Sequence, residues 1–416
     1  MVIVFGVLAL GVLVAGNWYL WRRLFRDTTR GPGLARRAGA AVITGGWLLA
    51  VGALVTERAG APFWLQQVLA WPGFLWLALS VYLLLGVVAG EVVRPVLRRL
   101  LERRARATEA AAVPQTQPVP AGSVPPKAPE PGQTAGTGPE SAPQPSRRLF
   151  VSRVVAGAAA AAAVGTVGYG TYGVLRGPSV KRVTVPLAKL PRAAHGYRIA
   201  VVSDIHLGPI LGRGFAQKVV DTINSTQPDI VAVVGDLVDG SVKNLGPAAA
   251  PLAQLNAPSY FVTGNHEYFS GAEQWVEEVR RLGLHPLENA RTELPWFDLA
   301  GVNDIAGESE GQGPDFAKAL GDRDTARACV LLAHQPVQIH DAVRHGVDLQ
   351  LSGHTHGGQL WPGSFVAAAA NPTVAGLERY GDTQLYVSRG AGAWGPPTRV
   401  GAPSDITVIE LASTRA

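Results

Sequence analysis

The feature that most constrains the fold of this 416-residue chain is a set of short apolar runs, each ending in polar side chains that can bind metal ions. The runs are rich in β-branched residues, which is typical of strands buried on both faces of a sheet. They lie at 198–202, 229–234, 259–262, 329–333 and 347–351, and the polar clusters follow at 203–206, 235–239, 263–267, 334 and 352–359. Because the carboxyl ends of parallel strands open onto one crevice, we expect these clusters to meet at a single site.

The last cluster contains two histidines one residue apart, His354 and His356. In an extended strand, residues i and i+2 point to the same side, so an extended strand end would make both imidazoles face one cavity. Neutral imidazole is the commonest side-chain metal ligand. Such a pair alone also fits a surface loop. Five clusters of the same type, all at strand ends, are not explained by core histidines and turn aspartates.

The ordered series of motifs resembles the calcineurin-like metallophosphoesterases over roughly residues 180–412. The motifs are D-x-H at 204–206, G-D-x-x-D at 235–239, G-N-H-E at 264–267, a lone histidine at 334 and G-H-x-H at 353–356. The segments at 357–359 and 392–396 are similar to the small bacterial membrane-associated branch of that family. The resemblance implies a four-layer α/β sandwich and a hydrolase with two metal ions.

Carried over motif by motif, the resemblance also implies the ligands. One ion would be held by Asp204, His206, Asp236 and His356, and the other by Asp236, Asn265, His334 and His354, with Asp236 as the bridge. The mixture of nitrogen and oxygen donors suits Mn, Fe or Zn better than Mg or Ca. A hydroxide shared by the two ions would be the nucleophile, so no protein nucleophile is needed.

Residues next to the ligands receive roles of their own. The resemblance makes His266 the general acid, and the alternative is a structural histidine beside the ligands. Asp239 and Glu267 are expected to orient ligands. We expect the remaining histidines to be structural or solvated and both nearby arginines to lie on the surface, although these arginines could contact a phosphate. These residues are His195, His285, His340 and His345, with Arg389 and Arg399.

The first part of the chain reads as a membrane region, residues 1–110. Apolar segments at 2–21, 38–55 and 68–90 are each long enough to cross a bilayer, and a buried soluble hairpin is the alternative. Arginines crowd residues 22–37 and 94–106, whereas the loop near residue 57 has little charge. The positive-inside rule therefore puts the arginine-rich loops in the cytoplasm and the amino terminus outside. A cleaved signal peptide is not expected, because positive charge follows the first apolar run instead of preceding it.

The charge is divided unevenly between the two parts. Residues 191–416 carry 16 basic and 24 acidic side chains, a net charge of −8, whereas the whole chain carries +6. The basic excess thus belongs to the membrane region and does not indicate nucleic-acid binding. Cys329 is the only cysteine, so a disulfide within the chain is impossible.

Between the two parts lie a linker and a fourth apolar segment. Residues 111–145 are rich in proline, alanine and glycine and are predicted to be a disordered linker. Residues 146–177 begin with Arg147-Arg148-Leu149-Phe150 and continue as an alanine-rich run. This segment resembles a signal for the twin-arginine export machinery, and the alternative is an ordinary fourth transmembrane helix. Both interpretations place residues 178–416 outside the cytoplasmic membrane.

That last region is predicted to alternate strands with helices at 214–226, 272–282 and 337–344, and a polar loop at 306–314 could cap the site. We expect a membrane-tethered phosphoesterase acting on a substrate near the membrane surface, on lipid or cell-wall phosphoesters, with phosphodiesters favoured by the resemblance. The alternatives are a non-catalytic receptor or scaffold for phosphorylated ligands, and a transporter with an accessory phosphoesterase.

Overall fold

The structure is a computed structural model that describes residues 2–111 and 147–414. The chain forms two compact units, one within residues 1–44 and 81–163 and the other within residues 45–80 and 164–416. Apart from residue 111, the predicted linker at 111–145 lies outside the described residues.

Four long helices account for the apolar segments. They are α1 (Val2–Trp21), α2 (Leu34–Arg58), α3 (Phe63–Ala111) and α4 (Arg147–Leu175). Among the described residues, α2, α3 as far as residue 107, and α4 are long and apolar enough to cross a membrane. These three contain the apolar segments predicted at 38–55 and 68–90 and the alanine-rich run.

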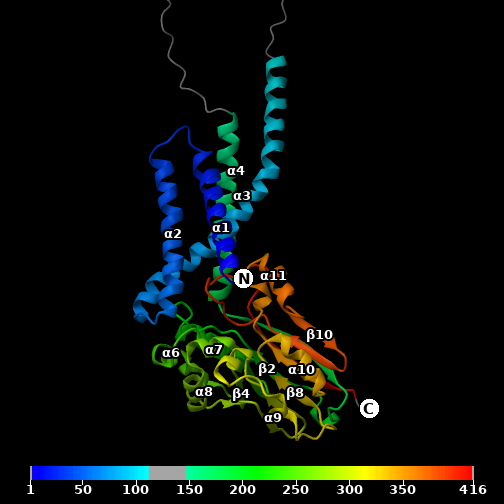
Figure 1. Cartoon of the computed structure of the whole chain (residues 1–416). Helices are drawn as coiled ribbons and strands as arrows, with labels where there is room; N and C mark the ends of the chain where they lie inside the picture. The colour runs from blue at the N-terminus through cyan, green and yellow to red at the C-terminus, as the bar shows by residue number, and fades with distance from the viewer. Residues whose placement is uncertain (1, 112–146, 415–416) are drawn as a thin grey trace, which may run out of the picture. The chain divides into compact units, whose positions relative to one another are not determined.

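Two six-stranded sheets form the centre of the second unit (Figure 1). The first has the order β1-β12-β2-β3-β4-β5 and the second β10-β11-β9-β8-β7-β6. The strands are β1 (Ser179–Leu187), β2 (Tyr197–Val202), β3 (Ile230–Val234), β4 (Ser259–Val262), β5 (His285–Pro286), β6 (Ala290–Glu293), β7 (Asp298–Gly301), β8 (Cys329–Leu332), β9 (Leu349–Ser352), β10 (Gly376–Tyr380), β11 (Thr383–Val387) and β12 (Asp405–Ser413). Neighbouring strands are parallel except for the pairs β12–β2, β10–β11 and β6–β7.

Helices cover the outer face of each sheet. The first sheet is covered by α5 (Arg213–Ser225), α6 (Val242–Ala249) and α8 (Ala272–Arg281), and the second by α9 (Phe316–Leu320) and α10 (Ile339–Arg344). Two further helices, α7 (Asn265–Ser270) and α11 (Gly363–Ala370), lie outside the cores beneath these helices. The remaining turns are the 3-10 turns η2 (Arg192–Ala194), η3 (Ala250–Gln254), η4 (Ile305–Glu310), η5 (Pro336–Gln338) and η6 (His356–Gly358), and a π-helical turn η1 (Arg22–Arg26) that follows α1. The predicted helices at 214–226 and 272–282 correspond to α5 and α8, and the one at 337–344 begins as a 3-10 turn.

Burial on both faces explains the continuous apolar runs. In β2, Ile199 and Val201 pack into the core between the two sheets. Ala200 and Val202 face the other way and pack in a second core, which also includes Val219 of α5. A third core lies between the second sheet and helices α9 and α10. The predicted four-layer α/β sandwich is therefore confirmed.

Candidate metal centre

The polar clusters lie where β2, β3, β4, β8 and β9 end, so the side chains that meet at the site come from both sheets. Five of these residues have a left-handed backbone, which is uncommon for residues other than glycine. They are Asp204 (φ 51°), His206 (φ 48°), Asp236 (φ 52°), His354 (φ 71°) and His356 (φ 53°). Backbone of this kind clusters at functional sites, where the surrounding structure holds it in place.

The left-handed backbone corrects one expectation. The pair His354 and His356 is not on an extended strand end, because β9 stops at Ser352 and His356 begins a 3-10 turn. The two imidazoles nevertheless line the same crevice. The tight turn, not strand periodicity, brings them there.

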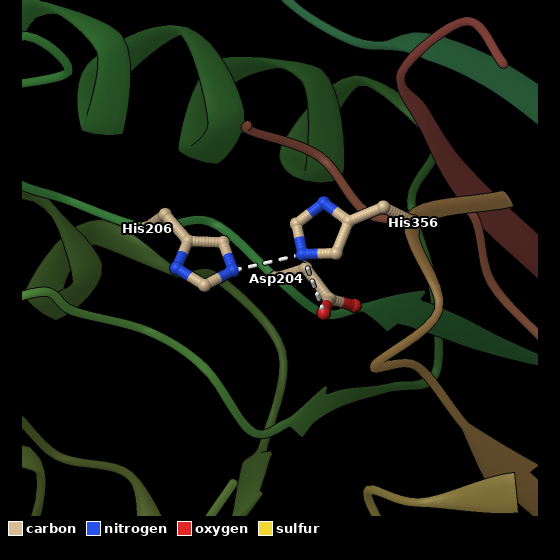
Figure 2. A group of neighbouring side chains, drawn as sticks. All are labelled: Asp204, His206 and His356. Atoms are coloured by element: carbon tan, nitrogen blue, oxygen red, sulfur yellow. Dashed lines mark hydrogen bonds and ion pairs between the residues drawn. The ribbon is translucent and has the colours of Figure 1, made fainter. Parts of the chain in front are cut away.

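The first group of potential ligands is Asp204, His206 and His356, all buried (Figure 2). Nε2 of His206 lies 3.0 Å from Nε2 of His356, which in turn lies 3.3 Å from Oδ1 of Asp204. Three donor atoms this close together, one of them on a carboxylate, suit a single cation. The Asp204 carboxylate is held in place by the backbone N–H of His354, 3.0 Å from Oδ1.

The second group is Asp236, His334 and His354. Nε2 of His334 lies 3.1 Å from Oδ2 of Asp236, and Nδ1 of His354 lies 2.9 Å from Oδ1 of Asn265. The same Asp236 oxygen lies 3.7 Å from Nε2 of His206 in the first group. Asp236 therefore stands between the two groups, as a bridging carboxylate would.

His334 provides the test of whether a metal fits. Its Nδ1 donates to the carbonyl oxygen of Val234 at 2.8 Å, so a neutral ring has a lone pair on Nε2. That Nε2 is buried, makes no hydrogen bond to any described residue, and faces the Asp236 carboxylate. Burial lowers the pKa of His334, but the carboxylate outweighs it and raises the pKa well above its usual range. A positive charge is needed between these two groups, and a divalent cation supplies it.

Asp239 joins two histidines. Its Oδ1 accepts from Nδ1 of His206 at 2.9 Å and from Nδ1 of His266 at 2.7 Å. This contact fixes the tautomer of His206 and leaves its Nε2 available to a metal. Against the effect of burial, the carboxylate raises the pKa of His266 to about 9, while the two histidines lower the pKa of Asp239 to about 2. The contact with Asp239 therefore favours the protonated form of His266.

Glu267 holds two of the loops together. Its buried carboxylate accepts from the backbone N–H groups of Asp236 at 2.9 Å, Leu237 at 2.8 Å and Gly264 at 2.6 Å. Only glycine fits at position 264, since a Cβ there would lie 2.3 Å from Oδ1 of Asp236. The motif glycine thus lets the loop after β4 approach the loop after β3.

The prediction that Arg399 lies on the surface is wrong. This side chain is buried, and its guanidinium donates to the carbonyl oxygens of Gly392, His356 and Ala402. Its Nη2 also lies 3.1 Å from Nδ1 of His356. Because a guanidinium only donates, this contact puts the ring proton on Nε2, whereas coordination through Nε2 needs the other tautomer. The arginine and a metal ion therefore compete for His356.

The remaining predicted residues lie apart from the site. His195, His285 and His340 are exposed, and His345 stacks on Phe316. The loop at 306–314 packs against α7, where the Tyr268 hydroxyl donates to the carbonyl oxygen of Gln312. It is not among the residues that line the crevice above the ligands.

That crevice has a volume of about 730 Å³. Its floor is formed by ligand residues and its rim by Phe269 and Trp394, whose rings stand 5.5 and 5.7 Å from the ring of His266. The sequence motifs include Trp394 but not Phe269. Phe269 is exposed and lies two positions after Glu267, the last residue of the motif at 264–267.

Two groups of nitrogen and oxygen donors around one shared aspartate, at the strand ends of an α/β sandwich, are typical of binuclear metal-dependent hydrolases. A model of the calcineurin-like phosphoesterase family matches residues 197–358, a span that contains every predicted ligand. The chain belongs to this family of metallophosphoesterases.

Relatives from animals and bacteria agree. The chain is 39% identical to a transmembrane protein with metallophosphoesterase domain from Danio rerio, over 58% of this chain and 59% of that protein. It is 36% identical to a metallophosphoesterase of Helicobacter pylori, over 64% of this chain and 73% of that protein. It is 35% identical to a metallophosphoesterase of Aquifex aeolicus, over 56% of this chain and 91% of that protein. The chain spans between 57% and 64% of the length of its relatives from Danio rerio, Campylobacter jejuni and Bos taurus. Together with the apolar helices, these relatives indicate a membrane-associated protein.

Proposed function

We propose that this protein is a membrane-tethered phosphoesterase that uses two divalent ions, Mn, Fe or Zn, to hydrolyse phosphodiesters outside the cytoplasmic membrane. Asp204, His206, Asp236 and His356 hold one ion, and Asp236, Asn265, His334 and His354 hold the other. The observation that carries the proposal is the position of Asp236 Oδ2 between the donor nitrogens of His206 and His334. When bound, such ions make a nucleophile of water at neutral pH and neutralise phosphoryl charge.

His266 supplies the proton that the leaving oxygen needs. Its Nδ1 is occupied by Asp239, and the residue itself lines the crevice beside the ligands. The carboxylate keeps the ring protonated, because it raises the pKa of His266 to about 9. A protonated imidazole at this position donates to an alkoxide-like leaving group.

The proposal that the catalytic region lies outside the cytoplasmic membrane rests on two features of the chain. They are the arginine-rich segments at 22–37 and 94–106 and the short connection between α4 and the catalytic region. Helix α4 ends at Leu175 and β1 begins at Ser179. Residues 146–177 act either as a signal for the twin-arginine machinery or as an ordinary fourth span. In both cases the catalytic region follows α4 directly and lies close to the outer surface of the cytoplasmic membrane.

Hydrolysis of a chromogenic diester tests the proposal. Full-length protein in detergent is stripped with a chelator and assayed with bis-p-nitrophenyl phosphate after Mn, Fe or Zn is added back. We expect turnover only with added metal, and slower release of p-nitrophenol from p-nitrophenyl phosphate, the matching monoester. Tight metal binding without turnover of either ester would favour a non-catalytic receptor, and preference for the monoester would overturn the diester assignment.

A further inference from the structure

Part of the wall of the catalytic crevice comes from α2, far from every motif in the sequence. Leu54, Glu57 and Arg58, in the last turn of this helix, line the same crevice as His266 and Trp394. These three residues belong to the same compact unit as the two sheets, because that unit includes residues 45–80 as well as 164–416. The carboxylate of Glu57 is close enough to interact electrostatically with Asp239 and His266.

Side-chain packing holds the α2–α3 hairpin in this position. Phe74 of α3 packs with Ala53 of α2 and with Ile210, in the loop after β2. Phe63, the first residue of α3, packs against the core formed by the first sheet and α5. The two helices approach closely at Gly73, where a Cβ would lie 2.5 Å from the carbonyl oxygen of Leu49. The hairpin end is therefore a built part of the site.

The rim of the crevice is apolar and open. Phe269 is 73% exposed, Trp394 47% and Leu54 36%. Exposed apolar side chains gathered at one place indicate a surface that binds an apolar partner. Arg58 is exposed at the same rim and makes no ion pair with any described residue, so its charge is available to a phosphate or another anionic headgroup.

The apolar surface continues from the rim along α2. Val51, Leu54, Val55 and Arg58 share one face of the helix, at the i, i+3, i+4 and i+7 spacing, and the three apolar members are exposed. Because α2 is of membrane-spanning length and composition, this face offers a lipid chain an apolar path that leads to the ligand residues.

We propose that the crevice binds a membrane lipid phosphoester, with its hydrocarbon chain along Leu54, Phe269 and Trp394 and its phosphate at the metal ligands. This inference rests on the proposed phosphoesterase activity and adds the substrate class and the α2 part of its binding site. A free nucleotide would use the two aromatic rings for stacking but would gain nothing from Leu54 or from the apolar face of α2.

The lipid site is tested on the full chain in nanodiscs with three diesters that share the p-nitrophenol leaving group. They are the dodecyl, ethyl and thymidine 5′-esters of p-nitrophenyl phosphate. We expect kcat/KM for the dodecyl ester to exceed that for the ethyl ester by on the order of 100-fold, since each buried methylene favours binding. A higher value for the thymidine ester than for the dodecyl ester would identify a nucleotide site and overturn the proposal.

Partition of the dodecyl ester into the bilayer also raises its rate, so variants decide the matter. In Leu54→Ser the dodecyl-to-ethyl ratio should fall about 10-fold, whereas Leu54→Phe should retain it. Val68→Ser, an exposed position on α3 that lies neither on this face of α2 nor at the crevice, is the matched control and should behave as wild type. Equal ratios in Leu54→Ser and wild type would overturn the proposal while leaving the phosphoesterase activity intact.

A measurement without turnover separates the two proposals. A dialkyl phosphate with a photoreactive diazirine in its chain is cross-linked to the protein in nanodiscs, and labelled peptides are identified. Label at residues 54–58 and 265–270, removed by excess dodecyl phosphate diester, supports the lipid site even if none of the three chromogenic esters is hydrolysed. Label confined to the outer surfaces of the spanning helices overturns the lipid site whatever the enzyme hydrolyses.

Discussion

At the scale of single residues, Asp236 connects the two groups of ligands. One of its oxygens faces both His206 and His334, and the other accepts the backbone N–H of His266 at 2.9 Å. We predict that Asp236→Asn loses both ions together, with metal affinity lower by about 100-fold or more, because changes even beside a ligand cost 10–100-fold. Metal analysis after dialysis measures this. Retention of two ions with normal turnover would show that the aspartate is not the bridge.

His266 should behave differently, because it lies beside the ligands and holds no ion itself. We predict that His266→Ala keeps both ions and loses about 10²–10⁴-fold in kcat for alkyl leaving groups. The loss should be much smaller for p-nitrophenolate, which leaves without a proton. A series of diesters with leaving groups of increasing pKa measures the dependence. Equal losses across the series would assign His266 a positioning role instead.

At the scale of elements, the sequence predicted the strands well, because strands buried on both faces must be short and apolar throughout. It did not predict how their ends turn: His354 and His356 were expected on an extended segment and lie on a left-handed turn. Nor did it predict that Arg399 is buried against His356, or that Leu54 borders the crevice. The residues that meet in this way are separated by 43 to more than 200 positions in the chain, so no local sequence pattern indicates that they meet.

The ligands come from the ends of both sheets, so ions that bind them should also stabilise the fold. A ligand present at 100 times its dissociation constant contributes about 2.7 kcal/mol. For a domain of this size that corresponds to a rise in Tm of about 5–10 °C. We predict this rise when Mn is added to the stripped protein, measured by calorimetry. His266→Ala should show the same rise and Asp236→Asn almost none; an unchanged Tm in the wild type would contradict a site shared by the two sheets.

At the scale of the whole molecule, the single cysteine makes the proposed topology easy to test. Cys329 is buried, and burial raises the pKa of its thiol to about 12, so the natural protein should react poorly with maleimides. We predict that a membrane-impermeant maleimide labels Glu277→Cys, on the exposed side of α8, in intact spheroplasts. Glu102→Cys, exposed on α3 among the arginines, should react only after lysis. The opposite pattern would place the catalytic region in the cytoplasm.

The position of β12 in the first sheet also governs the order in which this protein can be made. This strand separates β1 from β2 and pairs with both, yet its residues, 405–413, are synthesised more than 200 positions after those of β1 and β2. A growing chain therefore presents its hydrophobic helices to the membrane long before the sheet can close. During that interval β1 and β2 have open edges and the ligand loops lack their support. Attachment to the membrane thus precedes completion of the catalytic fold, and a nascent chain needs protection from edge-to-edge pairing until β12 arrives.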